Sequence, residues 1–132
     1  MCGIYGITEK NPKIIREIIN TCSHRGPNGF DIFSTKSLTL GHNLLSITSN
    51  SADGKQPWKS SKENILIYNG EIFNYKELLL RYKNKFFPKT TCDTELLSWL
   101  LDEYPYEEVI QNIIDSMHSF VFYNKTSQRP FL

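Results

Sequence analysis

The sequence predicts one folded domain in which helices cover one or more β-sheets. The chain has 132 residues, of which 39% are hydrophobic and 22% are charged, a balance typical of a globular protein with a real core. Its periodic segments follow the order strand, helix, several strands, two or three helices and a final strand. Periodicity alone leaves the number of sheets open, and it permits both an α/β and an α+β arrangement.

Strand and helix signals alternate along the first third of the chain. Ile4, Tyr5 and Ile7 alternate with the glycines at 3 and 6, which is typical of a short strand that another backbone approaches closely. Asn11 is a candidate cap for a helix over 12–21, because proline stands at its first position and the isoleucines fall on one face. Strands are predicted next over 30–34 and 38–45, joined by a polar turn.

Three polar features of this region have both a structural and a functional interpretation. The loop 23–29 holds Arg25 among turn residues. It is either an ordinary surface loop or a loop that holds the arginine near an anionic group. His42 shares a strand face with leucines, where a histidine is more often structural than catalytic. The polar loop 46–58 is long, and loops of this length often border a substrate pocket.

A buried strand over 65–68 leads directly into Asn69 and Gly70. Asn-Gly between apolar runs is first of all a hairpin signal, so local chemistry favours a tight turn. The same pair also offers a side-chain amide and an unhindered backbone N–H, which are the donors that an oxyanion needs. Local sequence leaves both interpretations open.

The second half of the chain predicts mainly helices. Asn74 is expected to cap the first of them, and Thr91 or Cys92 lies near the start of another. Asp93 falls in the first turn of that helix, where carboxylates commonly complement the helix dipole. The predicted elements are helices over 75–82, from 91 until Pro105 and over 106–114, and strands over 120–123 and from 130 onward.

Composition and charge exclude several classes of partner. The formal net charge of +1 argues against nucleic acid or an anionic membrane, and no apolar run reaches the length of a membrane span. Cys2, Cys22 and Cys92 cannot all pair with one another, and their spacing is unlike that of a zinc site, so no metal is expected. Free thiols and the lack of a signal peptide predict a cytoplasmic protein.

Cys2 follows the initiator methionine directly, so removal of Met1 leaves a cysteine as the mature N-terminus. That residue carries a thiol nucleophile and an α-amine on one carbon. The amine titrates at about 7.7–8.0 in model peptides, so near neutral pH it can accept the thiol proton. A plainer interpretation is that Cys2 only begins a buried strand, and a dipeptide alone does not decide between the two.

Seven motifs, taken together and in sequence order, resemble one protein family. They cover nearly the whole chain, although each is weak by itself. The pattern is similar to the glutaminase domain of class II glutamine amidotransferases, most closely the asparagine synthetase type. The motifs are Met-Cys-Gly-Ile at 1–4, His-Arg-Gly-Pro at 24–27, Gly-His at 41–42 before Leu-Ser-Ile at 45–47, Gln-Pro at 56–57, Tyr-Asn-Gly-Glu-Ile-Phe-Asn at 68–74, Asp-Thr-Glu at 93–95 and Phe-Val-Phe at 120–122.

The resemblance implies an α+β fold of the N-terminal nucleophile hydrolase type, with two stacked antiparallel sheets between helical layers. It implies that the Cys2 thiol attacks the side-chain amide of L-glutamine and passes through a thioester to glutamate and ammonia. Asn69 and Gly70 match the oxyanion donors. The implied substrate-site residues are Ile47 and Thr48 beside the substrate, Glu71 and Asp93 facing its ammonium, and Arg25 ordering the nucleophile.

One residue departs from the family pattern. Leu44 stands immediately before the Leu-Ser-Ile segment, where the family usually has an arginine that grips the α-carboxylate of glutamine. The absence of this arginine removes a charge-assisted contact with the substrate that is worth about 1.5–3 kcal/mol. Either Lys55 or Arg25 supplies the missing cation, or glutamine binds weakly.

The resemblance also implies a partner. In the family, further strands complete the glutaminase domain and an ATP-using synthetase domain follows. We therefore expect residues 1–132 to be a glutaminase domain that is incomplete at its C-terminal end, with no synthetase domain and no cofactor of its own, since ATP and Mg²⁺ belong to that other domain. An unfinished sheet edge predicts association, such as a homodimer. A truncated structural module with little or no turnover is the alternative function.

Overall fold

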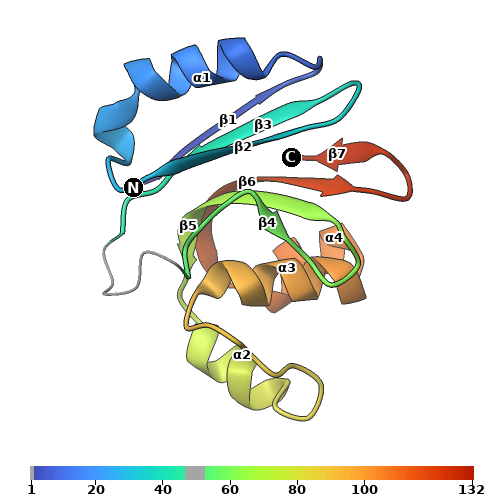
Figure 1. Cartoon of the computed structure of the whole chain (residues 1–132). Coiled ribbons are helices and arrows are strands. Elements are labelled where there is room, and N and C mark those ends of the chain that lie inside the picture. The colour runs from blue at the N-terminus through green and yellow to red at the C-terminus, as the bar shows by residue number, and fades with distance from the viewer. Residues whose placement is uncertain (1, 47–52) are drawn as a thin grey trace.

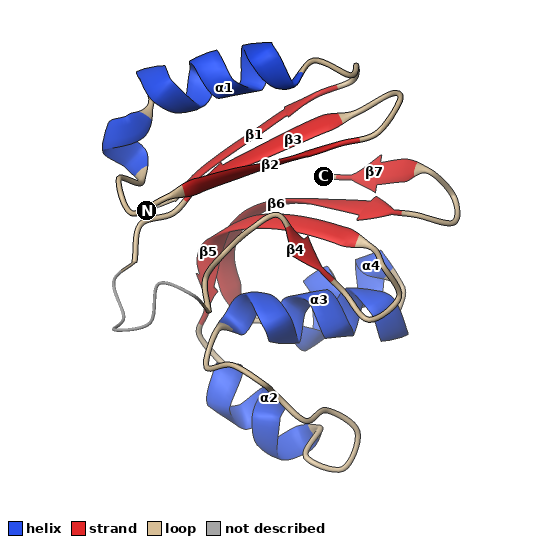
Figure 2. Ribbon diagram, in the orientation of Figure 1, coloured by secondary structure: helices blue, strands red, loops and turns tan. Residues whose placement is uncertain are grey.

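Two antiparallel sheets lie face to face, with helices on their outer faces (Figure 1 and Figure 2). The computed structural model describes residues 2–46 and 53–132. Every strand pair in this part of the chain is antiparallel, so the fold is the α+β sandwich that the family resemblance implies. The strands are β1 (Gly3–Ile7), β2 (Phe30–Ser34), β3 (Thr39–Asn43), β4 (Trp58–Lys59), β5 (Ile65–Ile72), β6 (Ser116–Asn124) and β7 (Arg129–Phe131). The helices are α1 (Pro12–Thr21), α2 (Tyr75–Arg81), α3 (Asp93–Glu103) and α4 (Tyr106–Glu108), with a 3₁₀ turn over Ser23–Arg25 and a π turn over Val109–Ile113.

The first sheet has the strand order β1-β3-β2 and carries α1 on its outer face (Figure 1). The helix starts where the sequence predicts, because the Asn11 side chain accepts a hydrogen bond from the Ile14 N–H at 3.2 Å. Gly41 permits the close approach of helix and sheet, since a Cβ there would lie 2.4 Å from a methyl carbon of Ile15. Ile15 and Ile19 are consequently buried.

The second sheet has the order β4-β5-β6-β7, and β5 is central to the site described below. β5 continues as a strand through Asn69 and Gly70, so the hairpin that local chemistry favours is wrong. The reason is pairing with β6 along the whole length of β5, which places Gly70 opposite His118 and outweighs the turn preference of one dipeptide. A Cβ at Gly70 would lie 2.2 Å from the Met117 carbonyl oxygen, so glycine is required by the close approach of the two strands.

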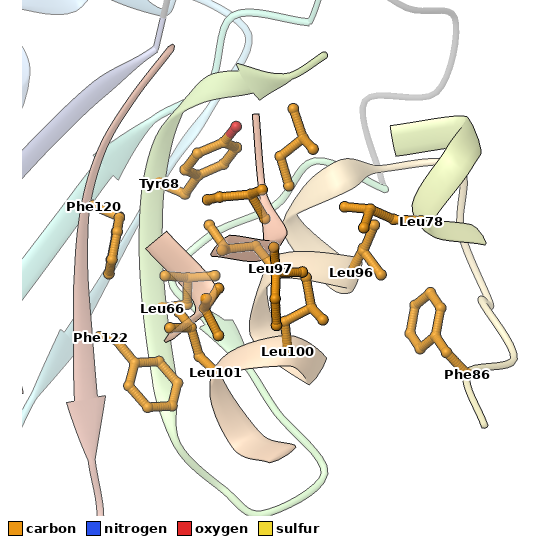
Figure 3. Packing of buried hydrophobic residues seen from close by; sticks show 14 of the residues in the cluster. Leu66, Tyr68, Leu78, Phe86, Leu96, Leu97, Leu100, Leu101, Phe120 and Phe122 are labelled. Atoms are coloured by element: carbon orange, nitrogen blue, oxygen red, sulfur yellow. The ribbon is translucent and has the colours of Figure 1, made fainter. Parts of the chain in front are cut away.

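The leucines of α3 fill the outer face of the second sheet (Figure 3). Leu96, Leu97 and Leu100 are completely buried in a cluster that includes Leu66 and Phe122 from the sheet. The sequence itself predicts this apolar stripe, because the leucines at 96, 97, 100 and 101 recur at helical spacing, and the structure confirms it. Each buried leucine contributes about 1.5–3 kcal/mol. α3 has 11 residues, and no helix in the described part of the chain is long and apolar enough to cross a membrane.

Asn74 precedes α2 as predicted, but it does not cap the helix with its side chain. The Asn74 amide instead donates to the Ile113 carbonyl at 3.0 Å and accepts from the Asp115 N–H at 3.0 Å. These partners lie far along the sequence, so a local cap rule does not reveal them. Asn74 consequently ties the start of α2 to the segment that precedes β6.

The helix predicted over 106–114 breaks after one turn. α4 ends at Glu108, and the Ile114 N–H bonds to the Val109 carbonyl five residues earlier at 3.0 Å, which is the pattern of a π turn. β6 begins at Ser116, earlier than the predicted strand, because it pairs with the extended end of β5. The short strand β4 was not predicted, since two residues carry no detectable period.

His42 is buried in β3 on the face that carries Leu40, a member of the apolar cluster between the sheets. Its Nε2 has no hydrogen-bond partner among the described residues. Burial lowers the pKa of His42 to about 4, because the charged imidazolium is poorly solvated there. This environment agrees with the structural interpretation of His42.

We expect acidification to destabilise the protein through His42. The imidazole titrates near 6.5 in the unfolded state and near 4 in the folded one, so the unfolded state binds the extra proton between these pH values. The contribution of neutral His42 to stability is therefore fully present above the pKa of the unfolded state. The free energy of unfolding falls by about 3 kcal/mol as the pH decreases toward 4. Urea unfolding of the wild type and His42→Gln between pH 7 and 4 measures this effect. Parallel pH dependences in the two proteins would contradict the expectation.

Candidate active site

A cleft of about 920 Å³ lies where the start of β1, the end of β5 and the start of α3 converge. Segments that are distant in the sequence meet in it. Its lining includes Cys2, residues 44–46, Asp53, Gly54, Gln56, residues 68–77, residues 91–94 and Met117. A second cleft of about 500 Å³, whose lining includes Phe33 and Tyr123, contains none of the residues that the family resemblance implies.

Cys2 is half-buried and lines the larger cleft. The Leu45 N–H donates to the Cys2 sulfur at 3.3 Å, and the thiol lies 3.8 Å from the Leu45 carbonyl oxygen. The Arg25 guanidinium donates to the Cys2 carbonyl at 3.5 Å. Contacts on both the side chain and the backbone thus hold the sulfur in a defined position.

The turn that carries Arg25 lies directly against the end of β3. A Cβ at Gly26 would come within 2.6 Å of the Asn43 carbonyl oxygen, so only glycine fits this approach. The Asn28 N–H then donates to the Leu44 carbonyl at 3.0 Å. The turn therefore positions Arg25 together with the backbone that follows β3.

One edge of β5 presents three N–H groups in the same direction. Alternate N–H groups of a strand point to the same edge, so those of Tyr68, Gly70 and Ile72 point away from β6. The Gln56 side-chain oxygen accepts the Tyr68 N–H at 2.5 Å, and the Asp93 carboxylate accepts the Ile72 N–H at 3.1 Å. The Gly70 N–H lies between these two, without a side-chain acceptor among the described residues. It is the donor that remains for a ligand.

Asn69 and Glu71 flank Gly70 in β5. Their side chains point to one face of the strand, and those of Tyr68 and Ile72 point to the other. Ile67 shares their face and belongs to the apolar cluster between the sheets. β1, which follows Cys2, contacts β5 across the sandwich. The Asn69 amide and the exposed Glu71 carboxylate therefore lie on the side of β5 from which the nucleophile candidate approaches.

Asp93 begins α3 and lines the cleft. One carboxylate oxygen accepts from the Tyr68 hydroxyl and from the Ile72 N–H, both at 3.1 Å. Burial raises the pKa of Asp93, while these hydrogen bonds act in the opposite direction. Burial and the nearby Asp93 charge raise the pKa of Tyr68, so its hydroxyl remains a neutral donor. The second oxygen of Asp93 lies 3.9 Å from the Cys92 sulfur.

Cys92 is the second cysteine of the cleft. Its thiol donates to the Thr94 hydroxyl at 3.3 Å, and burial raises its pKa. A thiol with a raised pKa is a poor nucleophile near neutral pH, so Cys2 is the better candidate. Within residues 2–46 and 53–132, no group of three or more His, Cys, Asp or Glu side chains is arranged to hold a metal ion.

The cleft combines a near-terminal cysteine, a strand N–H free for a ligand and several carboxylates, Glu71 and Asp93 among them, which suits hydrolysis of an amide next to an ammonium group. A family model described as a glutamine amidotransferase domain matches residues 1–132. The chain belongs to this family.

Glutamine-hydrolysing asparagine synthetases are among the curated relatives of this amidotransferase domain. Asparagine synthetase 1 of Arabidopsis thaliana is 32% identical over 128 residues, which are 92% of this chain and 21% of the relative. Asparagine synthetase B of Escherichia coli is 26% identical over 130 residues, which are 94% and 23%. A putative asparagine synthetase of Methanocaldococcus jannaschii is 32% identical over 148 residues, which are 95% and 28%. The chain thus spans about a quarter of the length of these relatives.

The structure brings together most of the residues that the resemblance implies for an amidotransferase site. The implied residues that line the cleft are Cys2, Asn69, Gly70, Glu71 and Asp93. Arg25 contacts the Cys2 backbone and is not part of the described lining, and Ile47 and Thr48 lie outside the described residues. Lys55 is exposed and is also absent from the described lining, whereas Leu44 lines the cleft and is 7% exposed.

Gln56 lines the cleft of the amidotransferase domain, although sequence reasoning gave it no role. Its buried side chain accepts the Tyr68 N–H and donates to the Thr94 hydroxyl at 3.3 Å, so it joins β5 to α3. The Gln-Pro motif was visible in the sequence, but its bonding partners depend on the fold. The backbone of Leu45 was missed for the same reason.

Proposed function

We propose that this protein hydrolyses the side-chain amide of L-glutamine through a thioester on Cys2 and releases glutamate and ammonia. The observation that carries the proposal is the presence of the Cys2 thiol and the outward Gly70 N–H in one cleft, with Glu71 and Asp93 in the same lining. Membership of the glutamine amidotransferase family supports the same reaction.

The first step requires the removal of Met1, which frees the α-amine of Cys2. The amine then accepts the thiol proton, since its ordinary pKa of about 7.7–8.0 leaves part of it neutral near pH 7.5. The sulfur attacks the amide carbon, and the C–N bond breaks as the protonated amine gives its proton to the departing ammonia. Water then attacks the thioester, so that glutamate leaves and the thiol is restored.

Asn69 and Gly70 supply the donors for the negatively charged oxygen of the tetrahedral intermediate. The Gly70 N–H is directed by the strand, whose neighbouring N–H groups are held by Gln56 and Asp93. The Asn69 side chain lines the same cleft. Because such donors are already oriented before the charge develops, each lowers the barrier by about 3–4 kcal/mol.

Glu71 and Asp93 bind the α-ammonium group of the substrate. The Tyr68 hydroxyl and the Ile72 N–H hold one oxygen of Asp93, which fixes the carboxylate before the substrate arrives. A carboxylate that is already oriented loses less conformational freedom on binding a cation. Arg25 orders the nucleophile through its contact with the Cys2 carbonyl.

The ammonia is passed to an ATP-dependent, asparagine synthetase-like domain or subunit. The support is that the named relatives are glutamine-hydrolysing asparagine synthetases and that this chain matches only part of their length. ATP and Mg²⁺ belong to that acceptor domain in this proposal. Free cysteines at positions 2, 22 and 92 suit a reducing, cytoplasmic location.

An assay of the purified protein with L-glutamine tests the proposal. We expect glutamate and ammonia to be released in equal amounts. The intact mass is measured in the same preparation, because a retained Met1 places the Cys2 nitrogen in a peptide bond and removes the base. Protein that lacks Met1 and still releases no glutamate would contradict the proposal and favour the structural-module alternative.

Leu44→Arg is expected to lower the KM for L-glutamine by about tenfold to a hundredfold. An arginine in this lining position adds a charge-assisted, bidentate contact to the α-carboxylate, which is worth about 1.5–3 kcal/mol. Steady-state kinetics of glutamate release measure the change. The leucine at position 44 also favours the alternative of a structural module with little turnover, so the same variant tests that alternative.

The matched control for Leu44→Arg is Leu80→Arg. Leu80 is 72% exposed on α2 and is absent from the described cleft lining, so it adds the same charge outside the site. Circular dichroism verifies that both variants retain the fold. An unchanged KM in a folded Leu44→Arg variant, or an equal fall in both variants, would count against the assigned role of position 44.

A further inference from the structure

The charge of the cleft is strongly one-sided. Among the described lining residues Lys76 is the one Lys or Arg, and residues 47–52 contain no ionisable side chain. The acids in the lining are Asp53, Glu71, Glu77 and Asp93. An ammonium group is therefore attracted into the cleft, whereas a free carboxylate is repelled.

Among the described residues beside the nucleophile, Leu44 offers no polar group to a carboxylate. Leu44 lines the cleft with an isobutyl group, and the following residue, Leu45, holds the Cys2 sulfur. The Leu44 N–H already donates to the Gly29 carbonyl at 2.8 Å, and the Leu44 carbonyl accepts from Asn28. A carboxylate at this wall would lose its water without gaining a charged partner or a free N–H from Leu44.

The cleft is also large for a single amino acid. Its volume of about 920 Å³ is near the upper end of the range of about 300–1,000 Å³ for sites that enclose drug-sized ligands. Phe73 and Met117 line it and remain 58% and 56% exposed. These apolar side chains provide a surface for a peptide that continues beyond the glutamine itself.

We infer that the preferred substrate is a glutamine whose α-carboxylate is blocked in an amide bond, as in the N-terminal glutaminyl residue of a peptide. The inference rests on the proposed glutaminase function and keeps its chemistry, in which the C–N bond of the glutamine side-chain amide is broken, water adds and ammonia leaves. The free α-ammonium retains Glu71 and Asp93 as partners. The neutral α-amide lies against Leu44 without a charge to desolvate.

Titration calorimetry on the Cys2→Ala variant tests this preference without turnover. The ligands are L-glutamine, its α-amide and N-acetyl-L-glutamine, which keeps the carboxylate but lacks the ammonium. We expect the α-amide to bind at least tenfold more tightly than glutamine, and N-acetyl-L-glutamine not to bind. Equal affinities, tighter binding of glutamine or binding of neither compound would overturn the inference.

A second variant links the preference to Leu44. Leu44→Arg, introduced into the Cys2→Ala protein, is expected to shift the affinity ratio toward glutamine by at least tenfold, whereas Leu80→Arg leaves the ratio unchanged. Ammonia release by the wild type separates the two proposals. If the α-amide binds best but neither compound is hydrolysed, the glutaminase function fails and only the binding preference stands. If glutamine is hydrolysed with a higher kcat/KM than its α-amide, only the preference fails.

Discussion

Replacing Cys2 with alanine is expected to reduce glutamate release from L-glutamine on the order of 10⁶-fold, to the uncatalysed background. The reaction proposed for this site forms a thioester, and no other group in the described lining replaces the lost sulfur. Cys92 lies in the same cleft, but burial raises its pKa and keeps its thiol protonated. A coupled assay for glutamate, run at saturating glutamine, measures the loss.

Cys22→Ala is the control for the effect of removing a thiol. Cys22 follows the last residue of α1, is half-buried and is not among the described lining residues. We expect this variant to retain the wild-type rate. Equal glutamate release by the wild type and Cys2→Ala would end the enzyme hypothesis and leave a module that keeps the fold without turnover.

Asn69→Ala is expected to lower kcat by about 10²–10³-fold while changing KM little. The amide binds an oxygen that becomes charged only in the transition state, so its removal weakens the transition state more than the ground state. Asn69 is only partly buried and pairs with Ser119 through the strand backbone, so alanine preserves the pairing of β5 with β6. Steady-state kinetics with L-glutamine separate the two parameters.

Asn112→Ala serves as the matched control, because Asn112 is exposed in the π turn after α4 and does not contribute to the described cleft lining. Its kinetics are expected to equal those of the wild type. A raised KM with an unchanged kcat in Asn69→Ala would assign Asn69 to substrate binding and would remove it from the oxyanion site.

Elements whose signals are local were predicted closely. α1 spans the predicted residues because its cap at Asn11, its proline at the first position and its apolar face all lie within a few residues of one another. The buried leucine stripe of α3 was predicted for the same reason. The predicted alternation of faces along β3 is also observed, since Gly41 meets α1 while Leu40 lies between the sheets.

Elements whose conformation depends on distant partners were predicted poorly. Asn69 and Gly70 have the local chemistry of a turn, but pairing with β6 keeps them in a strand. Asn74 has the chemistry of a helix cap, yet its side chain bonds to Ile113 and Asp115. In both cases a residue can satisfy its hydrogen bonds locally or at a distance, and only the completed fold selects between the two.

Residue identities and their order were enough to place the chain among the glutamine amidotransferases and to nominate Cys2, Asn69 and Gly70, because a motif series is read without coordinates. The folded arrangement was needed to show that Gln56 and Asp93 occupy the N–H groups on either side of Gly70. It was also needed to reveal the acidic lining of the cleft around Leu44. Both features arise from side chains that are far apart in sequence and meet only when the two sheets and α3 pack together.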